Sequence, residues 1–157
     1  MNNSALYKVV VCACIMLSLS AEAQLKPVPV RDITDSVQIN GKPVVVLIST
    51  ADCGYCRMQQ KQLQHSPDIL QLMAAFNYAT IDAGTKDSIL FNKQLYRYKS
   101  QEYVHELAEY LGRDEKGHLS YPCWIVLNNK YDIIFRYQGL LAPSELKKIL
   151  EKSIEIN

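Results

Sequence analysis

The side chains best suited to chemistry in this chain are two cysteines in a C-x-x-C, Cys53 and Cys56. They closely follow an apolar, β-branched run at 44–48 and lead into a helix-like segment at 57–64. A strand that ends in a C-x-x-C at the start of a helix is the setting of a redox dithiol. The helix N-terminus supplies unpaired N–H groups and partial positive charge, and both favour the thiolate that attacks disulfides. The spacing therefore predicts thiol–disulfide exchange.

The two sulfurs are expected to have different roles. Cys53, at the start of the helix, is the expected nucleophile that forms a mixed disulfide, and Cys56, one turn further and more buried, would resolve it. Tyr55 could offer a substrate an apolar and hydrogen-bonding surface. Asp52 could cap the helix or oppose the thiolate, unless it is only solvated. A structural or metal-binding C-x-x-C is the alternative for the pair.

Length and charge limit the possible functions. The chain has 157 residues and a net charge of +1. This length suits one ordinary domain, and the charge indicates neither a nucleic-acid surface nor a polybasic membrane patch. No nucleic-acid partner is expected.

Residues 1–23 are predicted to be a secretory signal peptide. Lys8 precedes an apolar run at 9–19, and Ala21-Glu22-Ala23 fits the small-x-small cleavage rule. An uncleaved anchor is the alternative, although the run is short for a membrane span. We therefore expect a mature domain of residues 24–157, periplasmic or otherwise secreted. It keeps three of the five cysteines, an odd number that suits one redox pair with a leftover thiol.

The remaining pattern predicts the elements of an α/β domain. Strands are expected at 44–49, 76–82, 123–127 and 133–137, and helices at 32–40, 53–64, 66–73, 102–111 and 144–150. Ser66 and Ser144 are expected as helix N-caps, and Gly112 as a C-cap. A hairpin around Asn92-Lys93 and the helix at 102–111 form an insertion over about 84–118. This order predicts a central sheet with helices on its faces.

The pattern resembles the thioredoxin superfamily over roughly residues 40–152. The matching features are the first strand, the C-x-x-C, Tyr121-Pro122, the strand hairpin after it, and Gly139 ahead of an amphipathic helix. The resemblance implies a three-layer α/β/α sandwich with the insertion before the strand that follows Pro122. It also implies that Pro122 is a cis-proline packed against the disulfide. The backbone of Tyr121 would then pair with an extended substrate segment. An ordinary turn proline is the alternative.

Details of the motif refine the resemblance. The Gly-Tyr pair between the cysteines is also found in bacterial periplasmic disulfide isomerases, and the insertion is similar to that of secreted thioredoxin-like proteins. Leu47 stands where thioredoxin has a buried aspartate, and Asp52 stands where it has a tryptophan. These departures count against a general reductant with thioredoxin's kinetics.

Cys123 has two interpretations, a third redox thiol or a small buried hydrophobe, and the second is favoured because free cysteine is often buried. A zinc site from Cys53, Cys56, Cys123 and a histidine is conceivable. The resemblance disfavours it, since the family's cis-proline blocks metal access. The three histidines show no triad or ligand spacing. We expect neither a metal nor another cofactor.

Together these features predict a monomeric periplasmic thiol–disulfide oxidoreductase, acting as a reductase or isomerase on protein disulfides or thiols through Cys53 and Cys56. A membrane-bound redox partner would recycle it. The alternative is a thioredoxin-fold binding module with a structural C-x-x-C, which would hold a partner through the Tyr121 edge and the insertion.

Overall fold

The computed structural model describes residues 25–33, 37 and 40–156. The predicted signal peptide and most of the helix expected at 32–40 lie outside these residues. The described chain begins with an extended segment and a short 3-10 helix, η1 (Val30–Asp32). Within the described ranges, no helix is both long enough and apolar enough to cross a membrane.

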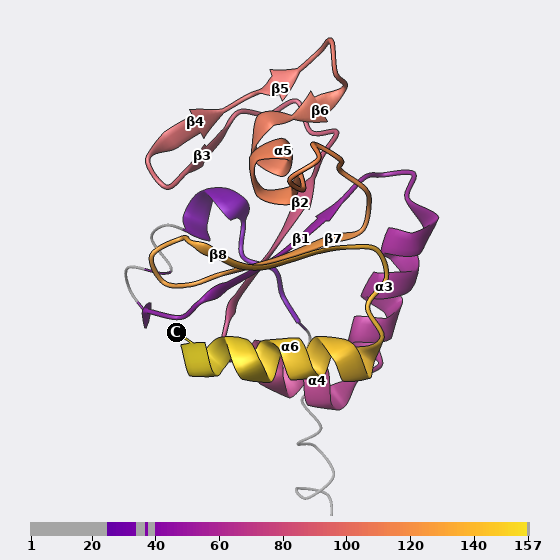
Figure 1. The fold of residues 1–157 in the computed structure, drawn as a ribbon, viewed down its shortest axis with the longest axis vertical. Coiled ribbons are helices and arrows are strands. Elements are labelled where there is room, and N and C mark those ends of the chain that lie inside the picture. The colour runs from indigo at the N-terminus through magenta and orange to yellow at the C-terminus, as the bar shows by residue number, and fades with distance from the viewer. Residues whose placement is uncertain (1–24, 34–36, 38–39, 157) are drawn as a thin grey trace, which may run out of the picture.

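A four-stranded mixed sheet forms the centre of the domain (Figure 1). Its strands, in spatial order, are β2 (Asn77–Asp82), β1 (Val44–Ser49), β7 (Cys123–Leu127) and β8 (Ile133–Gln138). β1 is parallel to β2 and antiparallel to β7, and β7 is antiparallel to β8. The first five residues of β1 are buried, which explains its continuous apolar sequence, because both faces of this central strand are covered. All four predicted strands are confirmed.

Helices cover both faces of the sheet, which confirms the predicted three layers. One face packs against α3 (Gly54–Gln64), α4 (Pro67–Met73) and α6 (Pro143–Ile156), and the other against η1 and α5 (Glu106–Gly112) (Figure 1). The alternation of side chains along β1 divides the core accordingly. Val45 and Leu47 lie in the α3 side of the core, whereas Val44, Val46 and Ile48 lie in the α5 side.

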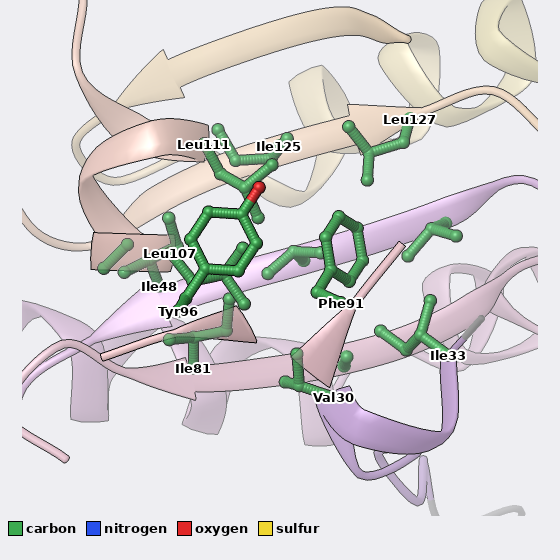
Figure 2. Close-up of a cluster of buried hydrophobic side chains, with 14 of the residues drawn as sticks. Val30, Ile33, Ile48, Ile81, Phe91, Tyr96, Leu107, Leu111, Ile125 and Leu127 are labelled. Carbon is green, nitrogen blue, oxygen red and sulfur yellow. The ribbon is translucent and has the colours of Figure 1, made fainter. Parts of the chain in front are cut away.

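The insertion contains two small hairpins and α5. The first pairs β3 (Ile89–Phe91) with β4 (Gln94–Tyr96), and the second pairs β5 (Tyr98–Lys99) with β6 (Val104–His105). Asn92 and Lys93 both have positive φ angles, as a two-residue hairpin turn requires. Phe91 and Tyr96 lie over the α5 side of the core (Figure 2). The hairpin expected around Asn92-Lys93 is confirmed.

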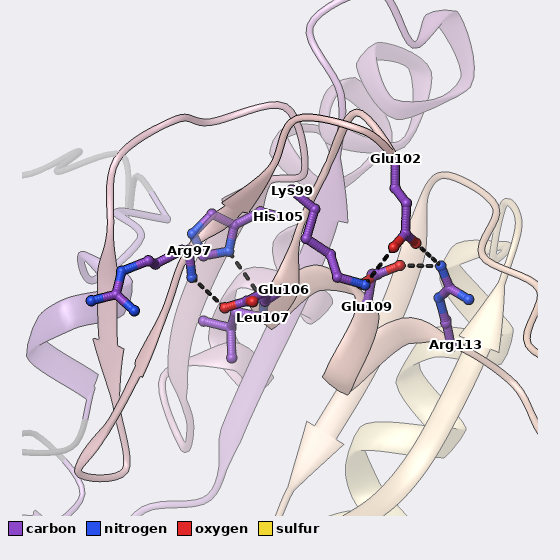
Figure 3. Close-up of polar contacts among 8 residues, drawn as sticks. All are labelled: Arg97, Lys99, Glu102, His105, Glu106, Leu107, Glu109 and Arg113. Carbon is purple, nitrogen blue, oxygen red and sulfur yellow. Dashed lines mark hydrogen bonds and ion pairs between the residues drawn. The ribbon is translucent and has the colours of Figure 1, made fainter.

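The helix expected at 102–111 is shorter than predicted because its first residues belong to the second hairpin. Val104 pairs with Lys99, and His105 caps α5 by accepting the Leu107 N–H at Nδ1 (3.2 Å). The buried Glu109 then ties α5 to the hairpin. It pairs with Lys99 (2.7 Å) and with Arg113 (Figure 3).

Of the three predicted helix caps, Ser66 is confirmed as an N-cap, whereas Ser144 and Gly112 are not cap residues. Ser66 is the N-cap of α4, but its hydroxyl donates to the Gln62 carbonyl (2.7 Å). Ser144 lies inside α6, which begins at Pro143. Gly112 is the last residue of α5, and the C-cap is Arg113, whose φ is −63°. A Cβ at Gly112 would lie 2.5 Å from Leu119 Cδ1, so a larger residue there would force the Leu119 side chain to shift.

Candidate active site

The two cysteines lie at the N-terminus of α3, just beyond the end of β1. Cys53 is the N-cap residue, and Cys56 lies in the first turn. Their sulfurs form a disulfide with an Sγ–Sγ distance of 2.03 Å and a Cα–Cα distance of 5.2 Å. Cys53 is partly exposed, whereas Cys56 is only 2% exposed. Cys53 is thus the sulfur that a second molecule can approach.

The backbone around the pair is arranged to stabilise negative charge on Cys53. The Cys56 N–H donates to Cys53 Sγ at 3.0 Å. The first turn of α3 contains no acidic residue, so nothing there opposes the partial positive charge of the helix N-terminus. Arg57 lies on the same turn and donates from Nη1 to the Ala51 carbonyl (3.2 Å). Asp52 is exposed and does not cap the helix, because Cys53 occupies that position.

Sheet topology brings Pro122 to the same edge as the cysteines. Because β7 is antiparallel to β1, its first residue, Cys123, lies opposite Ile48 near the end of β1. Pro122 comes directly before Cys123, so it is found where β1 leads into the C-x-x-C turn. Pro122 is buried, and the peptide bond between Tyr121 and Pro122 is cis.

Tyr55 and Tyr121 contribute different surfaces to this edge. Tyr55 is 63% exposed beside the sulfurs. The ring of Tyr121 packs against the α5 side of the core, and its burial raises the pKa of the phenol. In the described part of the chain, neither the backbone N–H nor the C=O of Tyr121 has a backbone hydrogen-bond partner.

Cys123 has the environment of a buried hydrophobe. Its side chain is fully buried, and Sγ contacts the Gly112 carbonyl at 3.8 Å. Burial raises the pKa of this thiol to about 12. It lies in the α5 side of the core, on the opposite face of the sheet from α3. The geometry therefore favours the packing interpretation over a third redox thiol.

The histidines are dispersed, in agreement with their spacing in the sequence. His65 Nδ1 contacts the Lys61 carbonyl at the end of α3, and the buried His105 contacts Leu107 and the Asp87 carbonyl. His118 forms a surface pair with Asp114 at 3.7 Å. Over the described ranges, no three histidine, cysteine, aspartate or glutamate side chains converge as metal ligands would.

Sequence reasoning missed Gln59, a buried polar residue on α3 one turn beyond Cys56. Its Oε1 accepts the Trp124 indole N–H (3.3 Å) and the Leu141 N–H (2.8 Å), and its Nε2 donates to the Leu141 carbonyl (3.1 Å). The side chain thus joins the cysteine helix to β7 and to the segment before α6. The signal was its position three residues after Cys56, on the same face of the helix.

Gln138, the last residue of β8, was also missed. Its Oε1 accepts the Ser120 N–H (2.8 Å), and its Nε2 donates to the carbonyls of His118 (2.8 Å) and Gly112 (3.0 Å). It thereby holds the segment that leads to Tyr121. No local pattern indicated this role, because its partners are 18 to 26 residues away in sequence.

Structural comparison places this arrangement among known folds. A thioredoxin from Thermus thermophilus matches with a TM-score of 0.61 and 19% identity, over 83% of this chain and 87% of that protein. A disulphide isomerase from Xylella fastidiosa Temecula1 matches with a TM-score of 0.53 and 18% identity, over 78% and 86%. The C-terminal domain of Neisseria meningitidis DsbD, in its reduced form, matches with a TM-score of 0.53 and 14% identity, over 77% and 90%. At these identities the likeness shows the fold.

Sequence comparison gives the family. No curated protein is a significant match to the chain. The model of a thioredoxin-like domain matches residues 30–154, which include the whole sheet, the insertion and both cysteines of the pair. The chain therefore belongs to the thioredoxin-like family, with a C-x-x-C pair at disulfide distance.

Proposed function

We propose that this protein is a thiol–disulfide oxidoreductase that exchanges disulfides with protein substrates through Cys53 and Cys56. The observation that carries the proposal is the position of their disulfide at the N-terminus of α3. One sulfur is partly exposed and accepts a backbone N–H, and the other is buried behind it. A dithiol with these features has a stabilised attacking thiolate and a resolving thiol within reach.

The exchange follows from the two positions. In the reduced protein, the Cys53 thiolate attacks one sulfur of a substrate disulfide, and the other substrate sulfur leaves as a thiolate and takes up a proton. Cys56 then loses its proton and attacks Cys53 Sγ, which releases the second substrate thiol and forms the Cys53–Cys56 disulfide. Two electrons pass to the substrate. If the released substrate thiolate instead attacks another disulfide of the substrate, and the thiolate freed there attacks the mixed disulfide and displaces Cys53, the outcome is isomerisation with no net transfer of electrons.

Substrate would be held beside the sulfurs by backbone pairing. The N–H and C=O of Tyr121 lie at the edge where β1 and β7 meet the cysteine turn, and an extended segment can add to them as a strand. The exposed ring of Tyr55 would cover the apolar part of that segment. Recognition of this kind suits polypeptides and places few demands on their sequence.

We further propose that the domain works as a monomer in the periplasm or outside the cell, as a reductase or isomerase recycled by a membrane-bound partner. The leader-like residues 1–23 support export, and the Gly-Tyr pair supports this direction. The equilibrium of the Cys53–Cys56 pair with glutathione measures the direction, because it gives the reduction potential relative to the compartment. Mass spectrometry of the exported protein tests the leader, with Gln24 as the expected first residue.

Reduction of insulin by dithiothreitol tests the activity. The protein should accelerate the reaction, and Cys53→Ser should abolish the acceleration. Cys123→Ser is the matched control, which should keep it because this thiol is buried on the other face of the sheet. Cys56→Ser should accumulate mixed disulfides with partner proteins. A wild-type rate equal to background, together with an empty trap, would favour a binding module with a structural cysteine pair.

A further inference from the structure

The side chain of Gln138 bonds to the backbone segment that leads to Tyr121. The backbone N–H and C=O of Tyr121 form the proposed substrate-binding edge, called the Tyr121 edge below. In the sheet register Gln138 pairs with Cys123, the residue that directly follows the cis-proline Pro122. All three of its side-chain hydrogen bonds go to backbone groups: the Ser120 N–H and the carbonyls of His118 and Gly112. Two of these partners belong to the three residues that precede Tyr121.

The next residue of the chain completes the arrangement on the other side of Tyr121. The Gly139 N–H donates to the Pro122 carbonyl at 2.7 Å. Fixed backbone groups therefore lie on both sides of Tyr121, at Ser120 and at Pro122. The backbone N–H and C=O of Tyr121 itself are left without backbone partners in the described chain.

Apart from the packing of Leu119 against the core, few contacts outside its own loop hold the segment before this edge. Residues 113–120 contain no helix or strand, and Asp114 closes the loop by accepting the N–H groups of Lys116 (2.9 Å) and His118 (2.8 Å). Between this closed loop and Pro122, the Gln138 side chain supplies the hydrogen bonds to the backbone. It also joins this segment to the end of α5 through the Gly112 carbonyl.

We propose that Gln138 is a positioning residue for the Tyr121 edge and so determines how well the protein takes an extended polypeptide as its disulfide substrate. The inference rests on the proposed function and deepens it. Binding by strand addition requires the N–H and C=O of one residue to lie in the plane and at the spacing of a strand. Gln138 holds the residues that set this geometry. A small disulfide without a peptide backbone needs no such edge and reacts at Cys53 alone.

Two disulfides, with and without a polypeptide backbone, separate this role from a general structural one. The probes are insulin and bis(2-hydroxyethyl) disulfide, and the variants are Gln138→Met, which loses all three hydrogen bonds, and Gln138→Glu, which keeps an acceptor for Ser120. Gln71→Leu, at an exposed glutamine on α4, is the control. Gln138→Met should raise KM for insulin about tenfold, the cost of one to two hydrogen bonds. Its kcat, and its rate with the small disulfide, should stay near wild type.

The outcomes distinguish the two proposals. An equal loss with both disulfides, or no loss with either, overturns the role of Gln138 while wild-type exchange stands. If Gln138→Met does not fold, Gln138→Glu, which loses only the two hydrogen bonds donated by Nε2, should give a smaller rise in KM for insulin and again no change with the small disulfide. Amide hydrogen exchange provides a readout that does not depend on activity: the Ser120 N–H should exchange faster in Gln138→Met than in wild type, and unchanged protection overturns the inference. Absence of Cys53-dependent exchange in the wild type overturns the proposed function itself.

Discussion

Replacing Gln59 with leucine should destabilise the fold more than the same substitution at an exposed glutamine. Gln59 is 1% exposed and uses both its amide oxygen and its amide nitrogen. Leucine has a similar volume and suits a helix, so the change removes hydrogen bonds while leaving little empty space. The groups left without a partner are the Trp124 indole N–H and the N–H and C=O of Leu141.

The size of the effect follows from these three groups. A buried donor or acceptor that loses its partner costs about 1 kcal/mol or more. The free energy of unfolding should therefore fall by about 3 kcal/mol. With an m value of about 2 kcal/mol per molar urea, the unfolding midpoint should fall by about 1.5 M. The fourth contact, from Gln59 Nε2 to Gln62 Oε1, adds little because Gln62 is only partly buried.

Urea unfolding of the oxidised protein measures this loss. Far-UV circular dichroism follows the helices, and fluorescence reports on Trp124, the single tryptophan of the chain. The control is Gln60→Leu, the exposed neighbour on α3, which should stay within about 0.5 kcal/mol of wild type. A Gln59→Leu variant that loses less than about 1 kcal/mol would refute the reasoning. Trp124→Phe, alone and combined with Gln59→Leu, then gives the coupling energy between the two side chains.

Three further substitutions test other parts of the structure. Gly112→Ala should cost about 1–3 kcal/mol in thermal or urea unfolding, because the new Cβ would lie 2.5 Å from Leu119 Cδ1 and 3.1 Å from Ile48 Cδ1. Burial raises the pKa of Cys123 from 9.0 to about 12, so its neutral thiol supports the fold fully below pH 9, and this support is lost as the pH rises towards 12. Unfolding measured from pH 8 to 11 should show the decline in wild type and less of it in Cys123→Ala. Glu109→Gln should lose about 1–2 kcal/mol, since its carboxylate is nearly buried between two cations, and an unfolding midpoint equal to wild type would contradict this.

The sheet and the cysteine turn could be predicted from the sequence because their signals are local. A covered central strand needs a continuous apolar run, and 44–48 has one. The C-x-x-C marks the start of α3 within four residues of the end of that strand. The order of the elements then allowed few arrangements, and the observed topology is one of them.

The details that were predicted wrongly or missed all depend on contacts between residues that are not adjacent in the sequence. Gly112 was expected as a C-cap, but the structure places it inside α5 close to Leu119, a contact that local propensity does not report. Residues 102–105 have helical periodicity, yet Val104 pairs with Lys99 in a hairpin. Gln59 bonds to Leu141, 82 residues away, so nothing beside it in the sequence indicates its partner.

The interior behind the cysteine helix has the apolar Leu47 at the position of thioredoxin's buried carboxylate, and the polar side-chain groups beside it are neutral. Leu47 and Trp124 face each other across β1 and β7, and the indole N–H of Trp124 is paired with the amide of Gln59. Among the described residues, the one buried carboxylate is Glu109, which lies on α5 across the sheet. A neutral amide neither accepts nor releases a proton near physiological pH. In the proposed exchange, the proton that Cys56 loses in the resolving step would then pass to solvent or to the departing substrate thiolate, past the partly exposed Cys53. In the proposed exchange, control of the chemistry would therefore be concentrated at the N-terminus of α3, where one backbone N–H on Cys53 Sγ and the helix dipole act on this sulfur.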